Sequence, residues 1–299
     1  MTEEQPATDG GRRAVAWYVP LIGSFLMLLA AMMVILVTAA GIAAALWLTH
    51  RTASASSSEM RMVSGHPRVV VTNREGAGDV LVVVGGEGEV RLEANQSVRT
   101  LPWQRAELAL APEAVRIVQD GDEIMIEVTS GVNWPDLWFR RVDLVITVPP
   151  AADLDVDTGL GALEVRRLTG RVRAVVPLGS TRLSGVQLTG SSTLASGSGD
   201  IRFDGSLAPA TTLHVENFAG NVRITLPVEA GTLLDAATEW STIAVDGWSV
   251  RLERDGPSWT ASGSLGVAET GSPATLRVRV TFGGIAIESR DSLSAISRA

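Results

Sequence analysis

The stretch Gly199-Asp-Ile-Arg-Phe203 is one copy of a five-residue phrase that recurs through the second half of the chain. The phrase reads as a small residue, any residue, a mostly aliphatic residue, any residue and a hydrophobic residue. The other copies are Gly161-Ala-Leu-Glu-Val165, Gly179-Ser-Thr-Arg-Leu183, Gly220-Asn-Val-Arg-Ile224 and Ser241-Thr-Ile-Ala-Val245. Taken in chain order, the first residues of the five copies are 18, 20, 21 and 21 positions apart. A fixed period of about 20 residues is typical of stacked repeats.

Each period holds two short strands with a tight turn between them. An apolar residue lies five positions before the first residue of each copy: Val156, Ala174, Leu194, Val215 and Ala236. Because strand side chains alternate between two faces, the third positions of the copies are predicted to lie side by side in adjacent turns of the stack. These are Leu163, Thr181, Ile201, Val222 and Ile243. The predicted fold class is all-β, a stacked-repeat β-solenoid (β-helix-like) with its repeats over residues 151–247.

Strand-like runs separated by Gly-rich turns lie on both sides of the repeats. Residues 115–128 read as a hairpin, two alternating strands around Asp-Gly-Asp turn chemistry. The ends of a repeat stack need caps. We expect residues 66–150, an N-terminal β region, to cap one end, and residues 248–299, with Trp248 and Trp259, to form a C-terminal β cap at the other.

An apolar segment near the N-terminus predicts a transmembrane helix. Residues 14–49 contain no Asp, Glu, Arg or Lys, and residues 21–48 are the most apolar part. As a helix, 21–48 would be about 42 Å long at ~1.5 Å per residue, longer than a hydrocarbon core of ~30 Å. The segment is about twice as long as the apolar region of a cleaved signal peptide, and a buried core helix of this length would carry polar residues.

The predicted order of segments is therefore a cytoplasmic tail over 1–13, a transmembrane helix over 14–50 and a Ser-rich linker over 51–65. The linker is expected to be a flexible spacer. This order predicts a single-pass protein of the cell membrane, held through residues 21–48, with a cytoplasmic N-terminus and the bulk of the chain extracytoplasmic.

The composition excludes several classes of function. The chain has 299 residues and a net charge of −8, so it lacks the basic footprint of a nucleic-acid-binding protein. It has no Cys, which excludes a disulfide framework, a thiolate metal site and a Cys nucleophile. Its three His residues, His50, His66 and His214, have no partners at the spacing of a zinc site. We expect no catalytic residue, no cofactor and no metal.

Asp153, Asp155 and Asp157 alternate along one predicted strand and face the same side. Carboxylate oxygens are ligands for a hard cation such as Ca²⁺. No Gly-rich calcium loop accompanies these residues, and a solvated strand face is the preferred interpretation.

Several stretches resemble the bacterial putative-adhesin family, a domain of unknown function related to the head domains of auto-transporter adhesins. The stretches that carry the resemblance are Val142–Pro149, Leu154–Gly161, Ser196–Phe203 and Ala219–Pro227. The resemblance covers most of the chain after the predicted linker. It implies a β-solenoid and an envelope protein, and no established activity. The aromatic segment Trp134–Phe139 departs from the family's pattern.

The first candidate ligand-binding residues are Arg182, Arg202 and Arg223, which take the same slot in successive copies, with Glu164 in the slot before them. Strands spaced by about 4.8 Å would place three guanidinium groups in a row. Aligned like charges are unfavourable unless carboxylates or an external polyanion neutralise them. The planar guanidinium suits carboxylate and phosphate groups, so an anionic envelope polymer is a candidate partner. The alternative is a solvated face that keeps the stack soluble.

The second candidate residues are Trp134, Trp138 and Phe139. If exposed, they would suit contact with a surface glycan, a protein or the membrane. Packing over an open end of the stack is the alternative.

These observations predict a non-enzymatic cell-surface protein, an adhesin or envelope-polymer-binding module. An accessory or sensor protein of envelope-stress signalling is the second interpretation, although the predicted cytoplasmic tail is too short for a signalling domain. A carbohydrate-active enzyme is the third, and a buried acidic pair in a groove would support it.

Overall fold

The computed structural model describes residues 32–38, 41, 51–100, 110, 114–128, 131–133, 138–229, 231–267 and 272–290. The chain divides into two compact units. One is Met1–Arg51 with Leu101–Gln104, and the other is Thr52–Thr100 with Arg105–Ala299. In the first unit, residues 32–38 are helical. The second unit is all-β, as the repeats predicted.

The prediction that residues 21–48 hold the chain in the cell membrane is wrong. Among the residues that the structure describes, no helix is long and apolar enough to cross a membrane. The 1–13 tail and the rest of the predicted 14–50 helix, apart from Gly41, lie outside the described residues.

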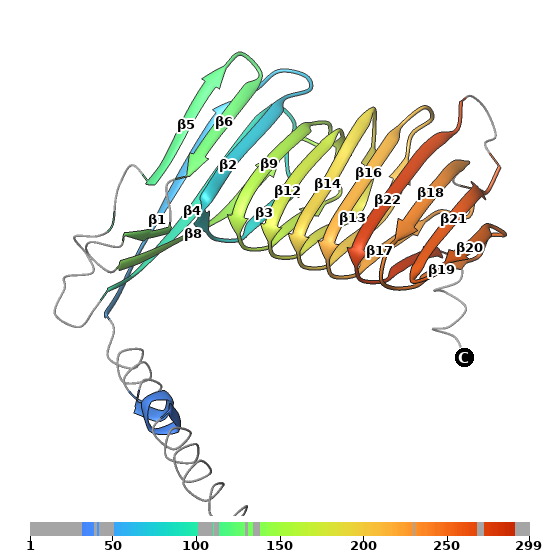
Figure 1. Cartoon of the computed structure of the whole chain (residues 1–299). Coiled ribbons are helices and arrows are strands. Elements are labelled where there is room, and N and C mark those ends of the chain that lie inside the picture. Colours follow the sequence, from blue (N-terminus) through green and yellow to red (C-terminus); the bar gives the residue numbers. More distant parts are fainter. Residues whose placement is uncertain are drawn as a thin grey trace, which may run out of the picture. The chain divides into compact units, whose positions relative to one another are not determined.

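The strands form two rows, and neighbours within each row are hydrogen-bonded (Figure 1). The first row runs in the order β5 (Val115–Asp120), β6 (Glu123–Val128), β2 (Arg68–Ala77), β9 (Asp153–Leu160), β12 (Val172–Leu178), β14 (Ser191–Ser198), β16 (Thr212–Ala219), β22 (Ala274–Phe282), β18 (Thr232–Thr238), β21 (Ser258–Leu265) and β20 (Arg251–Asp255).

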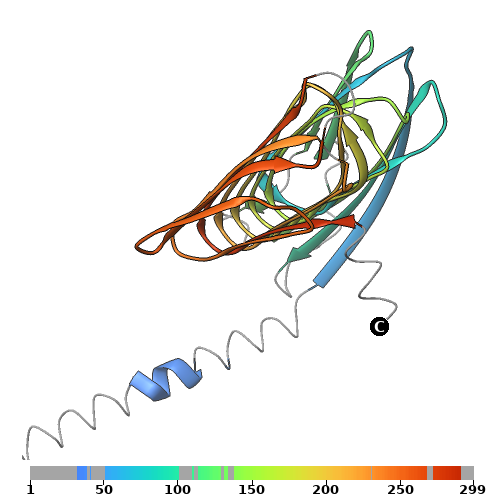
Figure 2. The same cartoon turned by 90° about the vertical axis from the view of Figure 1, so that its right-hand side faces the viewer.

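The second row runs in the order β1 (Arg51–Met62), β4 (Glu89–Thr100), β8 (Trp138–Val148), β3 (Val80–Val84), β10 (Leu163–Arg166), β13 (Thr181–Leu188), β15 (Ile201–Leu207), β17 (Val222–Leu226), β23 (Ile285–Ser289) and β19 (Ile243–Asp246). Two short strands complete the set: β7 (Gly131–Asn133), which pairs with β8, and β11 (Thr169–Gly170), which pairs with β13. Figure 2 looks along the rows, which lie on either side of the interior.

The predicted register of the repeats is confirmed for the first four copies. Leu163 pairs with Thr181, Thr181 with Ile201, and Ile201 with Val222, all in parallel strands. The apolar residues five positions before each copy are buried in the core that both rows share: Val156, Ala174, Leu194, Val215 and Ala236. The period of the sequence is therefore the period of the strand pairing.

The fifth copy does not stack on the fourth. Ile243 pairs with Ile285 instead of Val222, because β23 lies between β17 and β19. In the first row, β22 likewise lies between β16 and β18. The interpretation of 248–299 as a cap is thus wrong for its last two strands, which are internal. The β20–β21 hairpin does lie at the end of the row, and Trp248 and Trp259 pack against the core there.

The N-terminal β region extends the rows. Strand β2 pairs in parallel with β9, and β3 pairs in parallel with β10. The antiparallel hairpin predicted over 115–128 is present as β5 and β6, at the end of the first row.

The predicted flexible linker over 51–65 is largely a strand, because Arg51–Met62 forms β1 beside β4. The edge of β4 presents backbone N–H and C=O groups to this small polar segment. Pairing with them holds the segment as a strand despite its weak strand propensity.

Candidate functional site

Arg182, Arg202 and Arg223, which we call the arginine ladder, lie in the register that the repeats predict. Arg182 of β13 lies opposite Arg202 of β15, which lies opposite Arg223 of β17. Glu164 of β10 precedes Arg182 in the same row. All three guanidinium-bearing side chains are exposed, since they alternate with buried neighbours such as Leu183. The strand pairing thus brings three cations into one line on the outer face.

Acidic residues of the chain neutralise the ladder only loosely. Arg202 lies 3.8 Å from Asp200, and Arg223 lies 3.6 Å from Glu288. Within the described part of the chain, Arg182 makes no ion pair. These separations are longer than the ~2.7–2.9 Å of a charge-assisted hydrogen bond. The guanidinium groups therefore retain capacity for an external anion.

Glu164 forms its ion pair with an arginine outside the ladder, Arg166. Its carboxylate accepts a 2.9 Å hydrogen bond from Arg166. That bond, and then the charges of Arg166 and Arg182, hold the pKa of Glu164 below its ordinary value, while its slight burial acts in the opposite direction. The ladder thus begins at a carboxylate that Arg166 already occupies.

A hollow of about 310 Å³ lies on the arginine ladder. Its lining consists of Ser180, Thr181, Arg182, Asp200 and Arg202. Two adjacent guanidinium groups beside a hydroxyl suit a carboxylate or phosphate oxygen, because each guanidinium presents a planar fork of donors.

The predicted aromatic patch lies elsewhere on the second row. Trp134 lies outside the described residues. Trp138 and Phe139 begin β8, opposite Asn133 and Val132 of β7. The Phe139 side chain is half-buried. Strands β3 and β10 separate β8 from β13 of the ladder, so the structure does not bring the two candidate groups together.

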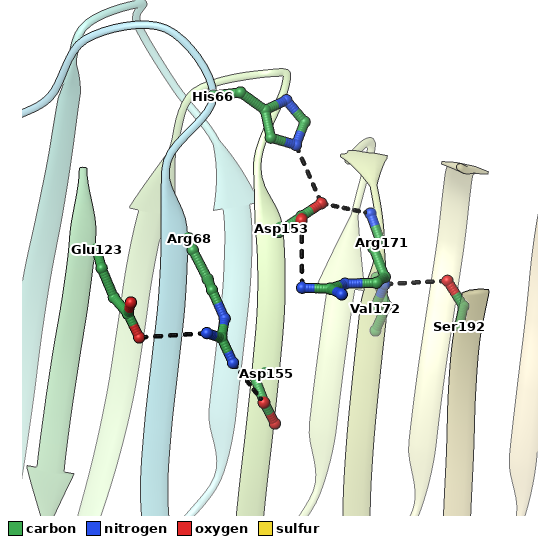
Figure 3. Close-up of polar contacts among 8 residues, drawn as sticks. All are labelled: His66, Arg68, Glu123, Asp153, Asp155, Arg171, Val172 and Ser192. Carbon is green, nitrogen blue, oxygen red and sulfur yellow. Dashed lines mark hydrogen bonds and ion pairs between the residues drawn. The ribbon is translucent and has the colours of Figure 1, made fainter. Parts of the chain in front are cut away.

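The three aspartates of β9 contact basic side chains from neighbouring segments, and Figure 3 shows contacts of Asp153 and Asp155. Asp153 accepts hydrogen bonds from the backbone amide of Arg171, at 2.8 Å, and contacts His66 at 3.0 Å. Asp155 lies 2.8 Å from Arg173 and 3.3 Å from Arg68.

The third carboxylate, Asp157, lies 2.6 Å from Arg74. Among the described residues, no group of three or more acidic or His side chains is placed to hold a metal ion. The row is therefore a cross-strand ion-pair network, with its countercharges supplied by the chain, and this disfavours Ca²⁺.

We expect Asp153→Asn to lower stability by about 1 kcal/mol at pH 7. Burial raises the pKa of Asp153, but the hydrogen bonds from His66 and the Arg171 amide, with the charges of both residues, lower it overall. A lowered folded-state pKa means that ionisation stabilises the fold above the ordinary value of 3.8, and that this contribution is lost as pH falls through the lowered value.

Urea unfolding of the parent chain and of the Asp153→Asn variant, at pH values from acid to neutral, measures this effect. The stability difference should be constant above about pH 5 and vanish toward about pH 2. A difference that persists unchanged at the acid end would show that the lost charge is not responsible.

A groove on the outer face of the first row was not predicted. Its volume is about 650 Å³, and it crosses β12, β14, β16, β22, β18 and β21. Phe218 and Trp259 line it, and small residues such as Ala195, Gly197 and Ala237 form part of its surface. The alternation of His214, Glu216 and Phe218 along one strand was the available signal, because it places an aromatic ring on the outer face.

No protein-family model and no curated protein matches the chain. Among solved structures, it is similar to a putative cell adhesion protein from Clostridium sporogenes ATCC 15579, with 14% identity, 79% of this chain and 100% of that chain covered, and a TM-score of 0.41. It is also similar to a putative adhesin from Bacteroides fragilis NCTC 9343, with 12% identity, coverage of 79% and 97%, and a TM-score of 0.38. The names agree with the resemblance seen in the sequence. At these TM-scores the likeness transfers neither ligand nor activity to this chain.

Proposed function

We propose that this chain is a non-enzymatic, adhesin-like binding module whose arginine ladder binds an anionic polymer of the kind found in bacterial envelopes. The observation that carries the proposal is the in-register row of Arg182, Arg202 and Arg223 with its incomplete internal neutralisation. Three like charges in line are unfavourable in isolation, and a polyanion relieves their repulsion.

We further propose that the two rows are the faces of a β-solenoid. The chain passes alternately from a strand of the first row to a strand of the second, from β9 and β10 to β16 and β17. Within each row these strands pair in parallel, and the two rows share one buried core. Such a stack presents long repetitive faces, which suit a repetitive ligand.

A polymer fits the ladder better than a small anion does. The guanidinium groups recur at the strand spacing of about 4.8 Å, so successive anionic groups of one chain reach successive arginines. The hollow is lined by two successive arginines of the ladder, Arg182 and Arg202, whose side chains are exposed. Linked weak contacts raise the overall affinity without an enclosed pocket.

Exposed acids weigh against the carbohydrate-active enzyme. The two glutamates of the groove, Glu216 and Glu239, are both exposed, and Glu216 lies 2.7 Å from His214. General acid catalysis by a carboxyl group relies on burial that raises its pKa. A binding role requires no such pair.

We expect Arg182→Ala/Arg202→Ala/Arg223→Ala to weaken binding of polyphosphate and polygalacturonate by at least about tenfold. The full chain is titrated into each fluorescently labelled polymer, and anisotropy gives Kd at several salt concentrations. Binding by the parent chain should weaken steeply with salt, because arginine contacts release counterions from the polymer, and the variant should show a shallower dependence.

The matched control is Arg91→Ala/Arg116→Ala/Arg251→Ala, which removes the same charge from exposed arginines off the ladder. It should stay within about threefold of the parent chain. Equal losses of polymer affinity in the two triple variants would show that net charge alone drives binding, and the ladder would not be a specific site. Absence of polymer binding by the parent chain would overturn the proposed function itself.

A further inference from the structure

Three aromatic rings are exposed together at the ends of adjacent strands of the first row. Phe218 is 59% exposed, Phe282 is 48% exposed and Trp240 is 62% exposed. The rings of Phe218 and Phe282 meet edge to face at 5.4 Å, and those of Trp240 and Phe282 stack at 6.4 Å. We call these three residues the aromatic platform. Exposed apolar surface gathered in one place marks an interaction site more often than scattered residues do.

Two further exposed apolar residues lie along the same edge of the stack. The positions before the turn glycines align across the row, from Leu160 to Leu178 and from Ala219 to Phe282. Leu160 and Leu178 are also exposed, at 44% and 51%. The same line passes through Ser198 of β14, so exposed apolar contact is available at β9 and β12 and again at β22.

The groove lies beside the platform and shares Phe218 with it. Between its apolar residues are hydrogen-bonding side chains from different strands: Glu216, Glu239, Ser258, Thr260, Arg279 and Thr281. A hydrophobic helix or acyl chain would leave these groups without partners. A ligand that carries both apolar faces and many hydroxyl groups satisfies the two kinds of surface at once.

The charge of the groove separates it from the arginine ladder. Arg279 is already paired with Asp235, at 2.7 Å. The lining also holds two exposed carboxylates, Glu239 and Glu216, the latter 2.7 Å from His214, so carboxylates outnumber guanidinium groups in the groove. A polyanion or an anionic lipid surface would be repelled here, whereas sugar hydroxyls can donate to the carboxylates and accept from the guanidinium.

We propose that the aromatic platform and the adjoining groove bind a neutral polysaccharide chain. The C–H faces of pyranose rings pack on the aromatic rings, and the ring hydroxyls bond to the polar groups of the groove. An extended sugar chain advances by a distance similar to the strand spacing of about 4.8 Å per ring, so each strand of the row meets about one sugar. The inference adds a second ligand class to the proposed binding function and does not depend on the ladder.

The test is retention of the full chain on microcrystalline cellulose, on chitin and on cross-linked dextran beads. The variant Phe218→Ala/Trp240→Ala/Phe282→Ala is compared with Met62→Ala/Leu252→Ala/Val267→Ala, which removes three exposed apolar side chains away from the groove. The platform variant should lose at least about tenfold in affinity for the retained polysaccharide, while the control stays within about twofold. Retention should be insensitive to salt, since no net charge is neutralised.

Several outcomes overturn the inference. One is absence of retention on all three polysaccharides, and another is equal retention of the platform variant. Capture by phosphatidylcholine vesicles without capture by any polysaccharide would assign the platform to a lipid surface instead.

Two further arms keep these results interpretable. If the triple variant fails to fold, Trp240→Ala alone tests the same contact at the most exposed ring. The ladder variant Arg182→Ala/Arg202→Ala/Arg223→Ala should keep polysaccharide retention while it loses polyanion binding, so failure of one site is distinguished from failure of the other.

Discussion

Removal of residues 272–299 is expected to abolish cooperative folding of the second unit, although these residues stand at the C-terminal end of the chain. The deletion removes β22 from between β16 and β18, and β23 from between β17 and β19. Four strands would lose their hydrogen-bonded neighbours in the middle of the rows. A true cap would have only one neighbour in each row to lose.

The buried side chains set the size of this effect. The deletion removes five large apolar residues of the core: Leu276, Val278, Val280, Ile285 and Ile287. At about 1.5–3 kcal/mol for each buried side chain, the loss is on the order of 10 kcal/mol, comparable with the entire stability of a typical domain. The unpaired backbone groups of the neighbouring strands add to it.

Circular dichroism melting of two truncated chains makes the comparison. A chain ending at Arg290 keeps β23 complete and is the reference. A chain ending at Gly271 should lack its cooperative transition or precipitate on expression. If it melts within about 3 °C of the reference, β22 and β23 are not internal strands, and the C-terminal region is a cap after all.

The positions of β22 and β23 inside the rows were not predicted from the sequence. The pattern in Gly283-Gly-Ile-Ala-Ile287 fits the repeat phrase, and so does Gly78-Asp-Val-Leu-Val82. Both stretches join the second row, Val80 beside Leu163 and Ile285 beside Val222. The even spacing of the other copies suggested that stacking order follows chain order. The spatial order depends on long-range pairing, and local sequence does not encode it.

The candidate site was predictable to a similar extent. The ladder followed from the alternation of the repeats, because one slot per copy becomes one line of side chains once the register is known. The aromatic platform was not predictable in this way. Phe282 and Trp240 share the parity of buried neighbours such as Val280 and Thr238, yet they are exposed, because they lie where the strands end and the chain turns. Exposure at a strand end depends on the path of the turn.

Substitution of a single turn glycine, Gly179→Ala, is expected to destabilise the fold by about 3–5 kcal/mol. Gly179 adopts φ of +146°, and its amide donates to Ser198. A Cβ built on it would lie 1.9 Å from the carbonyl oxygen of Gly161 in the preceding copy. Backbone cannot yield there without breaking the strand pairing on both sides, so the clash adds to the strain of a side chain at positive φ.

The control is a side chain at positive φ that meets no clash. Gly256→Ala also places a side chain at positive φ, +59°, but its Cβ would meet no atom within 4 Å. It should lower stability by about 1 kcal/mol, the strain alone. The melting temperature of Gly179→Ala should fall by about 10 °C, and that of Gly256→Ala by about 2–4 °C. Equal shifts would mean that the close approach of successive turns has no energetic weight. The small first residue of the repeat phrase would then reflect backbone angle only, and the spacing of the ladder arginines would not depend on it.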